Sequence, residues 1–102
     1  MILFAEVPGK PTVQVNQGDI QARSAVVRWS YSVASDEAPI TGFTLRHQNN
    51  DIVLPGGSFS KQLNNLKPYT SYTVRVKATS FLGTGDWSAP ETFTTLTDSK
   101  YW

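Results

Sequence analysis

The sequence predicts an all-β domain, a seven-stranded antiparallel sandwich of two sheets. Seven short segments rich in β-branched and aromatic residues recur about every ten residues, and clusters of Gly, Pro, Asn and Ser separate them. The clearest segments alternate apolar and polar residues with the period of a β-strand. The chain has 102 residues, which is enough to bury one hydrophobic core and leaves little room for a second. We therefore expect one folded unit that needs no helix.

The first strand is expected at residues 12–15, after an extended, proline-rich entry at residues 7–11. Each proline of the entry lacks the amide hydrogen that a β-ladder uses, so this segment should lead into the edge of a sheet. Val13 and Val15 share one face of the strand, and a turn should follow at residues 16–19.

The second and third strands are expected at residues 24–31 and 40–47, with a loop between them. The second shows the cleanest alternation, and its apolar face consists of Ala25, Val27 and Trp29. In the third, one face carries Phe43, Leu45 and His47, and the other carries Thr44 and Arg46. The pair Asn49-Asn50 is suited to a tight reversal, so we place the hairpin turn there.

Two short strands should follow the turn, at residues 52–54 and 58–63, on either side of Pro55-Gly56-Gly57. Phe59 and Leu63 are in phase on the second of them, and Lys61 lies between them in the same phase. A lysine at that position must either extend its charge to solvent or mark the edge of a sheet.

The last two strands are expected at residues 72–79 and 92–95. The later one is short and centred on Phe93, whereas the earlier one alternates over its whole length. Its apolar phase is Tyr72, Val74, Val76 and Ala78, and its polar phase is Thr73, Arg75, Lys77 and Thr79.

Composition excludes several classes of partner and site. With 9 Lys plus Arg against 8 Asp plus Glu, the formal charge of +1 gives no broad attraction to nucleic acids or anionic membranes. The absence of Cys excludes a disulfide framework, a Cys-ligated zinc site and a thiol nucleophile, but it leaves the cellular compartment open. No apolar run has the length of a membrane span, so we expect no direct membrane insertion.

The sequence offers no set of residues for catalysis, a metal or a cofactor. His47 is the single histidine, and no local spacing gathers carboxylates around it as a metal would require. A nucleophile elbow of the Gly-x-Ser-x-Gly type is missing. Gly83-Thr84-Gly85 is too short for a dinucleotide-binding loop and is expected to be a turn. We therefore predict that the domain is not an enzyme.

The order of these features resembles the fibronectin type III family over nearly the whole chain. The resemblance is carried by the entry prolines, Trp29 in the second strand, the stretch Leu66-Lys67-Pro68-Tyr69-Thr70-Ser71-Tyr72, and Gly83, Gly85 and Ser88 before the last strand. Ser80 and His47 depart from residues that are common in the family. The resemblance implies an immunoglobulin-like topology, with the first, second and fifth strands in one sheet, and no active site of its own.

Three residues are expected to anchor the core. Trp29 is similar to the family's core tryptophan, and its burial should contribute on the order of 3 kcal/mol. Leu66 should fill the bottom of the core, while the ring of Tyr72 is buried and its hydroxyl bonds to backbone across the corner.

Two surface features are candidates for binding. Arg46, Arg75 and Lys77 fall on the polar phase of neighbouring strands and should form a small basic patch, which is either a solvated face or a weak site for a heparin-like polyanion. The second feature is the expected loop at residues 80–88, where the large apolar residues are Phe81, Leu82 and Trp87.

This loop has two interpretations. It is either a protein-contact loop, or Trp87 folds back over the sheet and stacks on cationic side chains while Leu82 closes the base of the loop. We favour the second interpretation for Trp87 and regard Phe81 as the better candidate contact.

We expect residues 8–97 to be the domain, residues 1–7 a linker or the end of a preceding module, and residues 98–102 a C-terminal linker. The predicted function is a non-catalytic interaction or spacer module of a multidomain cell-surface receptor or adhesion protein, contacting protein partners and neighbouring domains. The alternatives are a spacer of an intracellular giant muscle protein and an accessory domain of a secreted enzyme.

The chain has neither Arg-Gly-Asp nor an Asn-x-Ser/Thr sequence, so integrin binding and N-glycosylation are not expected. We expect an extracellular location for the domain, and an intracellular one is not excluded.

Overall fold

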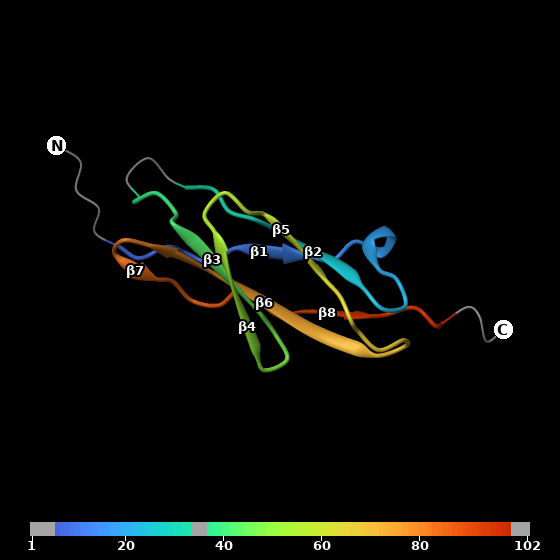
Figure 1. Ribbon diagram of the computed structural model, residues 1–102. Coiled ribbons are helices and arrows are strands. Elements are labelled where there is room, and N and C mark those ends of the chain that lie inside the picture. The colour runs from blue at the N-terminus through green and yellow to red at the C-terminus, as the bar shows by residue number, and fades with distance from the viewer. Residues whose placement is uncertain (1–5, 34–36, 99–102) are drawn as a thin grey trace.

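The computed structural model describes residues 6–33 and 37–98, and these residues form two antiparallel β-sheets packed face to face (Figure 1). The predicted sandwich is therefore confirmed. The first sheet has the order β1-β2-β5 and contains β1 (Thr12–Gln14), β2 (Ala25–Ser30) and β5 (Ser60–Leu63). The single helical element of the described residues is the 3-10 turn η1 (Gln17–Asp19).

The second sheet has the order β4-β3-β6-β7, and β8 also pairs with β6. Its strands are β3 (Gly42–His47), β4 (Asn50–Pro55), β6 (Ser71–Ser80), β7 (Gly83–Thr84) and β8 (Glu91–Thr94). The distribution of strands between the sheets is the one that the resemblance implied.

The described residues contain eight strands instead of the predicted seven, because Gly83–Thr84, in the expected loop, form the additional strand β7 ahead of β8. Between them the amides of Gly85 and Ser88 still donate to carbonyls of β6, at Ala78 (2.9 Å) and Val76 (2.8 Å). The expected loop at residues 80–88 is also wrong, since Ser80 pairs with Gly83 and the turn contains two residues.

Two glycines that were expected in a turn instead allow close packing at and beside β7. Gly83 belongs to β7, although it was expected in a turn, and its φ of 137° favours glycine. Gly85 lies against the carbonyl of Pro8, where a Cβ atom would have no room. These glycines allow the entry segment to pack against the edge of the second sheet.

The β3–β4 hairpin turns one residue earlier than expected. Its turn residues are Gln48 and Asn49, and Gln48 has a φ of 55°. This register places Leu45 opposite Ile52 and Phe43 opposite Leu54. The earlier turn is favoured because it keeps the apolar residues of both strands on the same face.

The core lies between the inward faces of β2, β3 and β6. Val27, Leu45, Val74 and Val76 are fully buried, and burying one such side chain contributes about 1.5–3 kcal/mol. Phe43 is the centre of an aromatic cluster, with ring centroids 5.8 Å from Trp29, 6.4 Å from Tyr31 and 5.4 Å from Phe59.

The lysine and the proline-rich entry that were expected at sheet edges both lie there. Lys61 lies opposite Val27 on β5, the edge strand of the first sheet, as one of its two interpretations predicted. The entry leads into the edge strand β1 and packs closely, with Pro8 and Pro11 buried.

A clasp centred on Tyr31 holds the entry segment. The amide of Gly9 donates to the hydroxyl of Tyr31 (2.9 Å), which donates in turn to the carboxylate of Glu37 (2.7 Å). Partial burial and the hydrogen bond to Glu37 raise the pKa of Tyr31.

Candidate functional site

The described residues contain no arrangement that resembles a metal centre. No group of three or more His, Asp or Glu side chains comes together within residues 6–33 and 37–98. No helix in this part of the chain is long and apolar enough to cross a membrane. Polar side chains form two clusters in the described part of the molecule, one on the outer face of the second sheet and one at a corner.

The first is the outer-face cluster, which we define as Arg46, Asp51, Arg75, Lys77 and Trp87. It forms on the outer face of the second sheet because β3 and β6 are neighbours with their polar phases in register. Arg46 lies directly opposite Arg75, and Thr44 lies opposite Lys77. The structure thus brings the three predicted cations together.

Asp51 on β4 holds Arg46 in a two-pronged ion pair. Nε and Nη2 of Arg46 donate to the two carboxylate oxygens of Asp51 at 2.7 and 3.0 Å. These hydrogen bonds lower the pKa of Asp51, and the nearby charges of Arg46 and Lys77 act in the same direction. The charge of Arg46 is therefore largely compensated within the cluster.

Trp87 lies over the same face and contacts two of the cations. Cζ of Arg46 is 4.5 Å from the centroid of the indole ring, and Nζ of Lys77 is 4.3 Å from it. The neighbouring Ser88 fixes the chain, since its amide donates to Val76 and its hydroxyl accepts from the Val76 amide at 3.0 Å. The expected folding back of Trp87 onto cationic side chains is confirmed.

Arg75 differs from the other two cations. It is exposed, it forms no ion pair within the described ranges, and unlike Arg46 and Lys77 it makes no cation–π contact with the Trp87 ring. Its cross-strand partner is Arg46, a like charge. Beside it lies a shallow hollow whose lining includes Arg46, Gln48, Ser71 and Thr73. Guanidinium, amide and hydroxyl groups are all hydrogen-bond donors, which suits an anionic group.

The other two candidate contacts lie in the turn between β6 and β7. Phe81 is 68% exposed, and Leu82 is 36% exposed. Leu82 belongs to the two-residue turn itself, so the expectation that it closes the base of a long loop is wrong.

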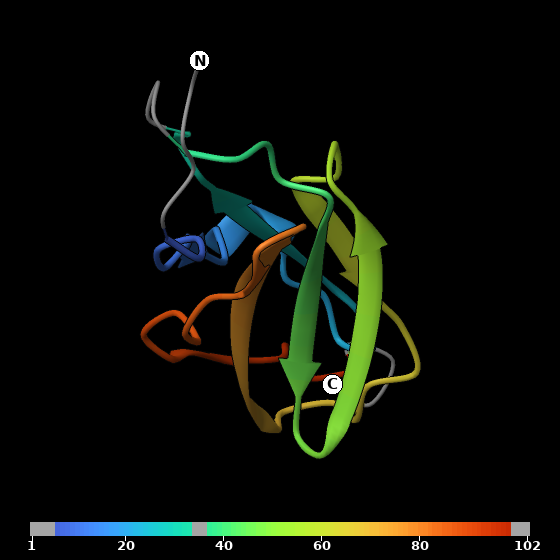
Figure 2. The same ribbon diagram turned by 90° about the vertical axis from the view of Figure 1, so that its left-hand side faces the viewer.

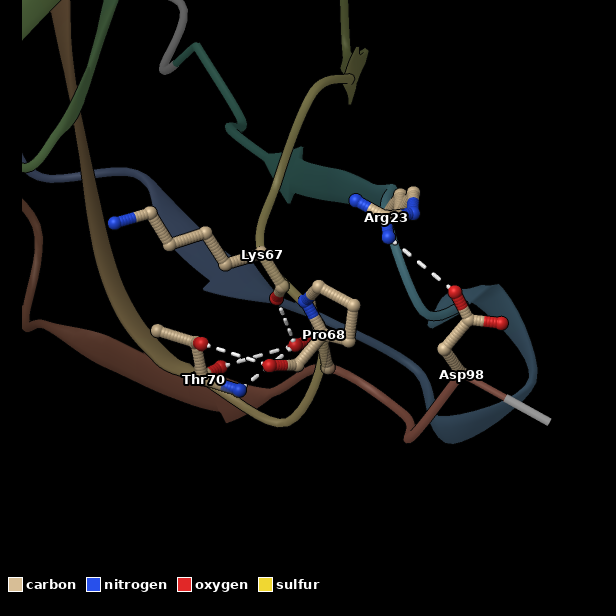
Figure 3. Close-up of polar contacts among 6 residues, drawn as sticks. Arg23, Lys67, Pro68, Thr70 and Asp98 are labelled. Atoms are coloured by element: carbon tan, nitrogen blue, oxygen red, sulfur yellow. Dashed lines mark hydrogen bonds and ion pairs between the residues drawn. The ribbon is translucent and has the colours of Figure 1, made fainter. Parts of the chain in front are cut away.

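The second is the lower corner, which we define as Leu66, Lys67, Thr70, Tyr72 and Thr95. Figure 3 shows Lys67 and Thr70 of this corner. Trp29, Leu66 and Tyr72 are 4%, 3% and 6% exposed, so all three expected anchors are buried. The hydroxyl of Tyr72 accepts a hydrogen bond from the amide of Lys67 at 2.8 Å. This is the bond to backbone across the corner that the resemblance implied.

Thr95 completes the corner, and the sequence analysis missed it. Its side chain is buried, and its hydroxyl donates to the carbonyl of Lys67 at 2.6 Å while accepting from the amide of Thr70 at 2.9 Å. The hydroxyl of Thr70 donates to the carbonyl of Pro68 (Figure 3). The signal available in the sequence was a threonine two residues after Phe93, and therefore on the same face, directly after β8.

An ion pair closes the corner on its exposed side. Nη2 of Arg23 lies 3.3 Å from a carboxylate oxygen of Asp98, and both residues are labelled in Figure 3. The contact joins the chain before β2 to the chain after β8.

The comparisons with known proteins agree with this architecture. The model of the fibronectin type III domain matches residues 9–94. The chain belongs to the fibronectin type III family. A fibronectin type III domain from chicken CNTN1 shares its fold, since a structure of the FN1–FN3 domains has a TM-score of 0.74 and 23% identity and covers 88% of this chain and 33% of that one.

Two relatives show the setting in which similar domains occur. Contactin of Drosophila melanogaster is 34% identical over an alignment of 97 positions that covers 85% of this chain and 7% of contactin. Protein sidekick-2 of Mus musculus is 32% identical over an alignment of 102 positions that covers 87% of this chain and 4% of that protein. The chain thus spans a small fraction of the length of both relatives.

Proposed function

We propose that this fibronectin type III domain is a non-catalytic interaction and spacer module of a multidomain cell-surface adhesion protein. The observation that carries the proposal is its similarity to contactin and sidekick-2, which are multidomain cell-adhesion proteins and in which a domain of this size is a small part. The domain would act in the extracellular part of such a protein, with residues 8–97 as the module and the residues on either side as connections to its neighbours.

The path of the described chain supports the spacer role. The chain enters beside β7 at one end of the elongated sandwich and leaves beyond β8 at the other end (Figure 1). Entry and exit at opposite ends allow modules to be joined head to tail, so that each domain adds its length to the array. The buried Pro8 and Pro11 would stiffen the junction with a preceding module.

The location of the parent protein tests this proposal. An antibody raised against the purified domain is applied to intact cells and to permeabilised cells that express the endogenous protein. We expect staining of intact cells, abolished when surface protein is removed by brief trypsin treatment. Staining that requires permeabilisation would instead support the muscle spacer, and antigen found only in the medium would support the secreted enzyme.

A weak polyanion site is a second candidate function, favoured by the gathering of Arg46, Arg75 and Lys77 on one face. Within the described ranges Arg46 is paired with Asp51 and Lys77 lies over the Trp87 ring, whereas Arg75 has neither kind of contact and lines the hollow. A sulfated polysaccharide presents closely spaced anionic groups, which a row of cations on a flat sheet would contact.

Retention on a heparin column tests the polyanion site. We expect retention that falls sharply with added salt and is lost in Arg75→Glu. Lys10→Glu changes the net charge by the same amount on the exposed entry segment and should keep most of the retention. Equal losses in both variants would show that net charge alone acts, and would reject the site.

Phe81 and Leu82 remain proposed contacts for a protein partner. Phe81→Ala should leave the free energy of unfolding within about 0.5 kcal/mol of the wild type, as expected for an exposed position, while weakening adhesion by the parent protein. A loss of stability as large as that of a core truncation would assign Phe81 to the fold and remove it as a contact.

A further inference from the structure

The edges of the two sheets are protected unequally. An edge strand presents unpaired backbone N–H and C=O groups, and proteins block such edges with short strands, prolines, bulges or inward-pointing charges. Edge strand β1 has three residues and directly follows Pro11. Edge strand β5 carries Lys61 in the inward phase. The β7–β8 edge is interrupted between Thr84 and Glu91, and the interruption includes Pro90.

Strand β4 has none of these features before its last residue. It runs for six residues without interruption, it contains no lysine, and its one proline, Pro55, is at its end. Figure 2 shows β4, in light green, along the outer edge of the sheet beside β3. Val53 in its middle is 80% exposed, the highest value among the large hydrophobic side chains of the described residues.

The register of the hairpin identifies which backbone groups are free. His47 and Asn50 flank a two-residue turn and therefore form a hydrogen-bonded pair. Hydrogen-bonded and non-bonded pairs alternate along an antiparallel ladder. The pairs of Asp51 with Arg46 and of Val53 with Thr44 are thus non-bonded, and the N–H and C=O groups of Asp51 and Val53 point away from β3.

We propose that β4 pairs antiparallel with β4 of a second copy of this chain, in a register centred on Val53. Each Val53 would then exchange two hydrogen bonds with Val53 of the other copy. Each Asp51 amide would face the carbonyl of Pro55, which already accepts from the Ser58 amide at 3.1 Å and has a second lone pair, while Pro55 itself has no N–H to donate. The interface is isologous, because both copies contribute the same strand, and it joins the two second sheets into one.

The side chains favour this register over the neighbouring one. A register centred on Ile52 would place Val53 against the carboxylate of Asp51, whereas the Val53-centred register places two β-branched side chains together. The ion pair with Arg46 compensates the charge of each Asp51, which reduces repulsion between the copies.

A hollow beside the edge gives the two valines a surface to pack on. Its lining includes Val53, Pro55, Thr44 and Thr79 around Gly42. Gly42 contributes no side chain to this lining, and a Cβ atom there would lie 3.0 Å from the carbonyl oxygen of Leu54. One strand pair and this rim make a small interface, so we expect a weak dimer that forms as the concentration rises from micromolar to millimolar.

Sedimentation velocity over this concentration range tests the proposal, together with amide hydrogen exchange read residue by residue. We expect the sedimentation coefficient to rise toward that of a dimer, and the amides of Asp51 and Val53 to become protected as it does. Val53→Lys should abolish both changes without altering the melting temperature, because the side chain is exposed. Val33→Lys places the same charge at another exposed valine, outside the strands, and should dimerise like the wild type.

Two results would overturn the proposal. The first is a single monomeric species at every concentration. The second is a dimer that persists in Val53→Lys, or that forms without protection of the Asp51 and Val53 amides, since either would place the interface elsewhere on the molecule.

Discussion

The lower corner and the outer-face cluster both consist of polar groups at the ends or faces of β-strands, but they differ in burial and in charge. At the lower corner, the hydroxyls of Tyr72 and Thr95 are buried and bond to backbone groups that have few alternatives. In the outer-face cluster, the guanidinium of Arg46 and the carboxylate of Asp51 are both about half exposed.

This difference in burial indicates which polar groups contribute most to the stability of a small β-sandwich. A buried hydrogen bond is costly to remove because its partner is left without water, whereas water and salt replace much of an exposed ion pair. We therefore assign the lower corner mainly to stability. The outer-face cluster contributes less to stability, and its charge remains available to a ligand. The predictions below test this division.

The largest effect is expected for Thr95→Val, which removes the hydroxyl at nearly constant shape. The change leaves the carbonyl of Lys67 and the amide of Thr70 without that partner, and we expect a loss of about 2–4 kcal/mol in the free energy of unfolding. Urea denaturation measures it. Thr94→Val is the control, because Thr94 is exposed and pairs only with the exposed Ser71, and it should change the stability by less than about 0.5 kcal/mol.

Tyr72→Phe should have the next largest effect. The ring stays in the core, but the amide of Lys67 loses its acceptor, and we expect a loss of about 1–2 kcal/mol. Tyr69→Phe is the control, because Tyr69 is 75% exposed. If both variants are equally stable in urea, the corner hydrogen bond does not contribute to the free energy of unfolding. The assignment of the lower corner to stability would then be wrong.

Trp87→Ala tests the outer-face cluster. We expect a loss of about 1–2 kcal/mol from the indole contacts with Arg46 and Lys77 and from the uncovered sheet. A double-mutant cycle with Lys77→Ala should give a coupling energy of about 0.5–1 kcal/mol. A coupling near zero would show that the stacked geometry adds nothing beyond ordinary packing.

Acidification should produce the smallest effect. The pKa of Asp51 is lowered by Arg46, so its contribution to stability is present above the ordinary pKa of an aspartate and is lost as the pH falls through the lowered value. Asp51→Asn should therefore be slightly less stable than the wild type at neutral pH, and the difference should shrink as the pH falls below the ordinary pKa of an aspartate and through the lowered value. The pKa of Asp19 is lowered by Arg28 in the same way, so the wild type and Asp51→Asn both keep a second ion pair that is sensitive to acid.

The Asp51 effect should also fall with added salt, because both charges are exposed. Thermal unfolding over a grid of pH and salt concentration measures both dependences. A difference between Asp51→Asn and the wild type that persists unchanged at low pH would contradict the ion-pair interpretation.

Much of the fold could be predicted because alternation along a strand is a local property. The apolar phases of β2, β3 and β6 were assigned correctly from residues such as Val27, Leu45 and Val76. The resemblance to the fibronectin type III family added the corner anchors Leu66 and Tyr72. Arg46, Arg75 and Lys77 could be placed on one face for two reasons. Each lies on the polar side of its strand, and their strands β3 and β6 are neighbours, as expected.

The missed features depend on contacts between distant segments. The hairpin turn at Gln48 follows from pairing two apolar faces, and the additional strand β7 lies where Gly83 and Gly85 pack against the entry segment. Thr95 could not be recognised as an anchor, because its hydrogen-bond partners lie 25 to 28 residues away in the chain. None of these contacts has a signature within a short window of sequence.

The amino-acid sequence by itself determined the all-β class, the inward faces of the strands and the absence of cysteine chemistry, since these depend on residue type and a period of two. Only the tertiary structure decided the register of the turns, the burial of Thr95, the stacking of Trp87 and the exposure of the β4 edge. These features depend on contacts between segments that are far apart in the chain, and such contacts form only when the two sheets pack together.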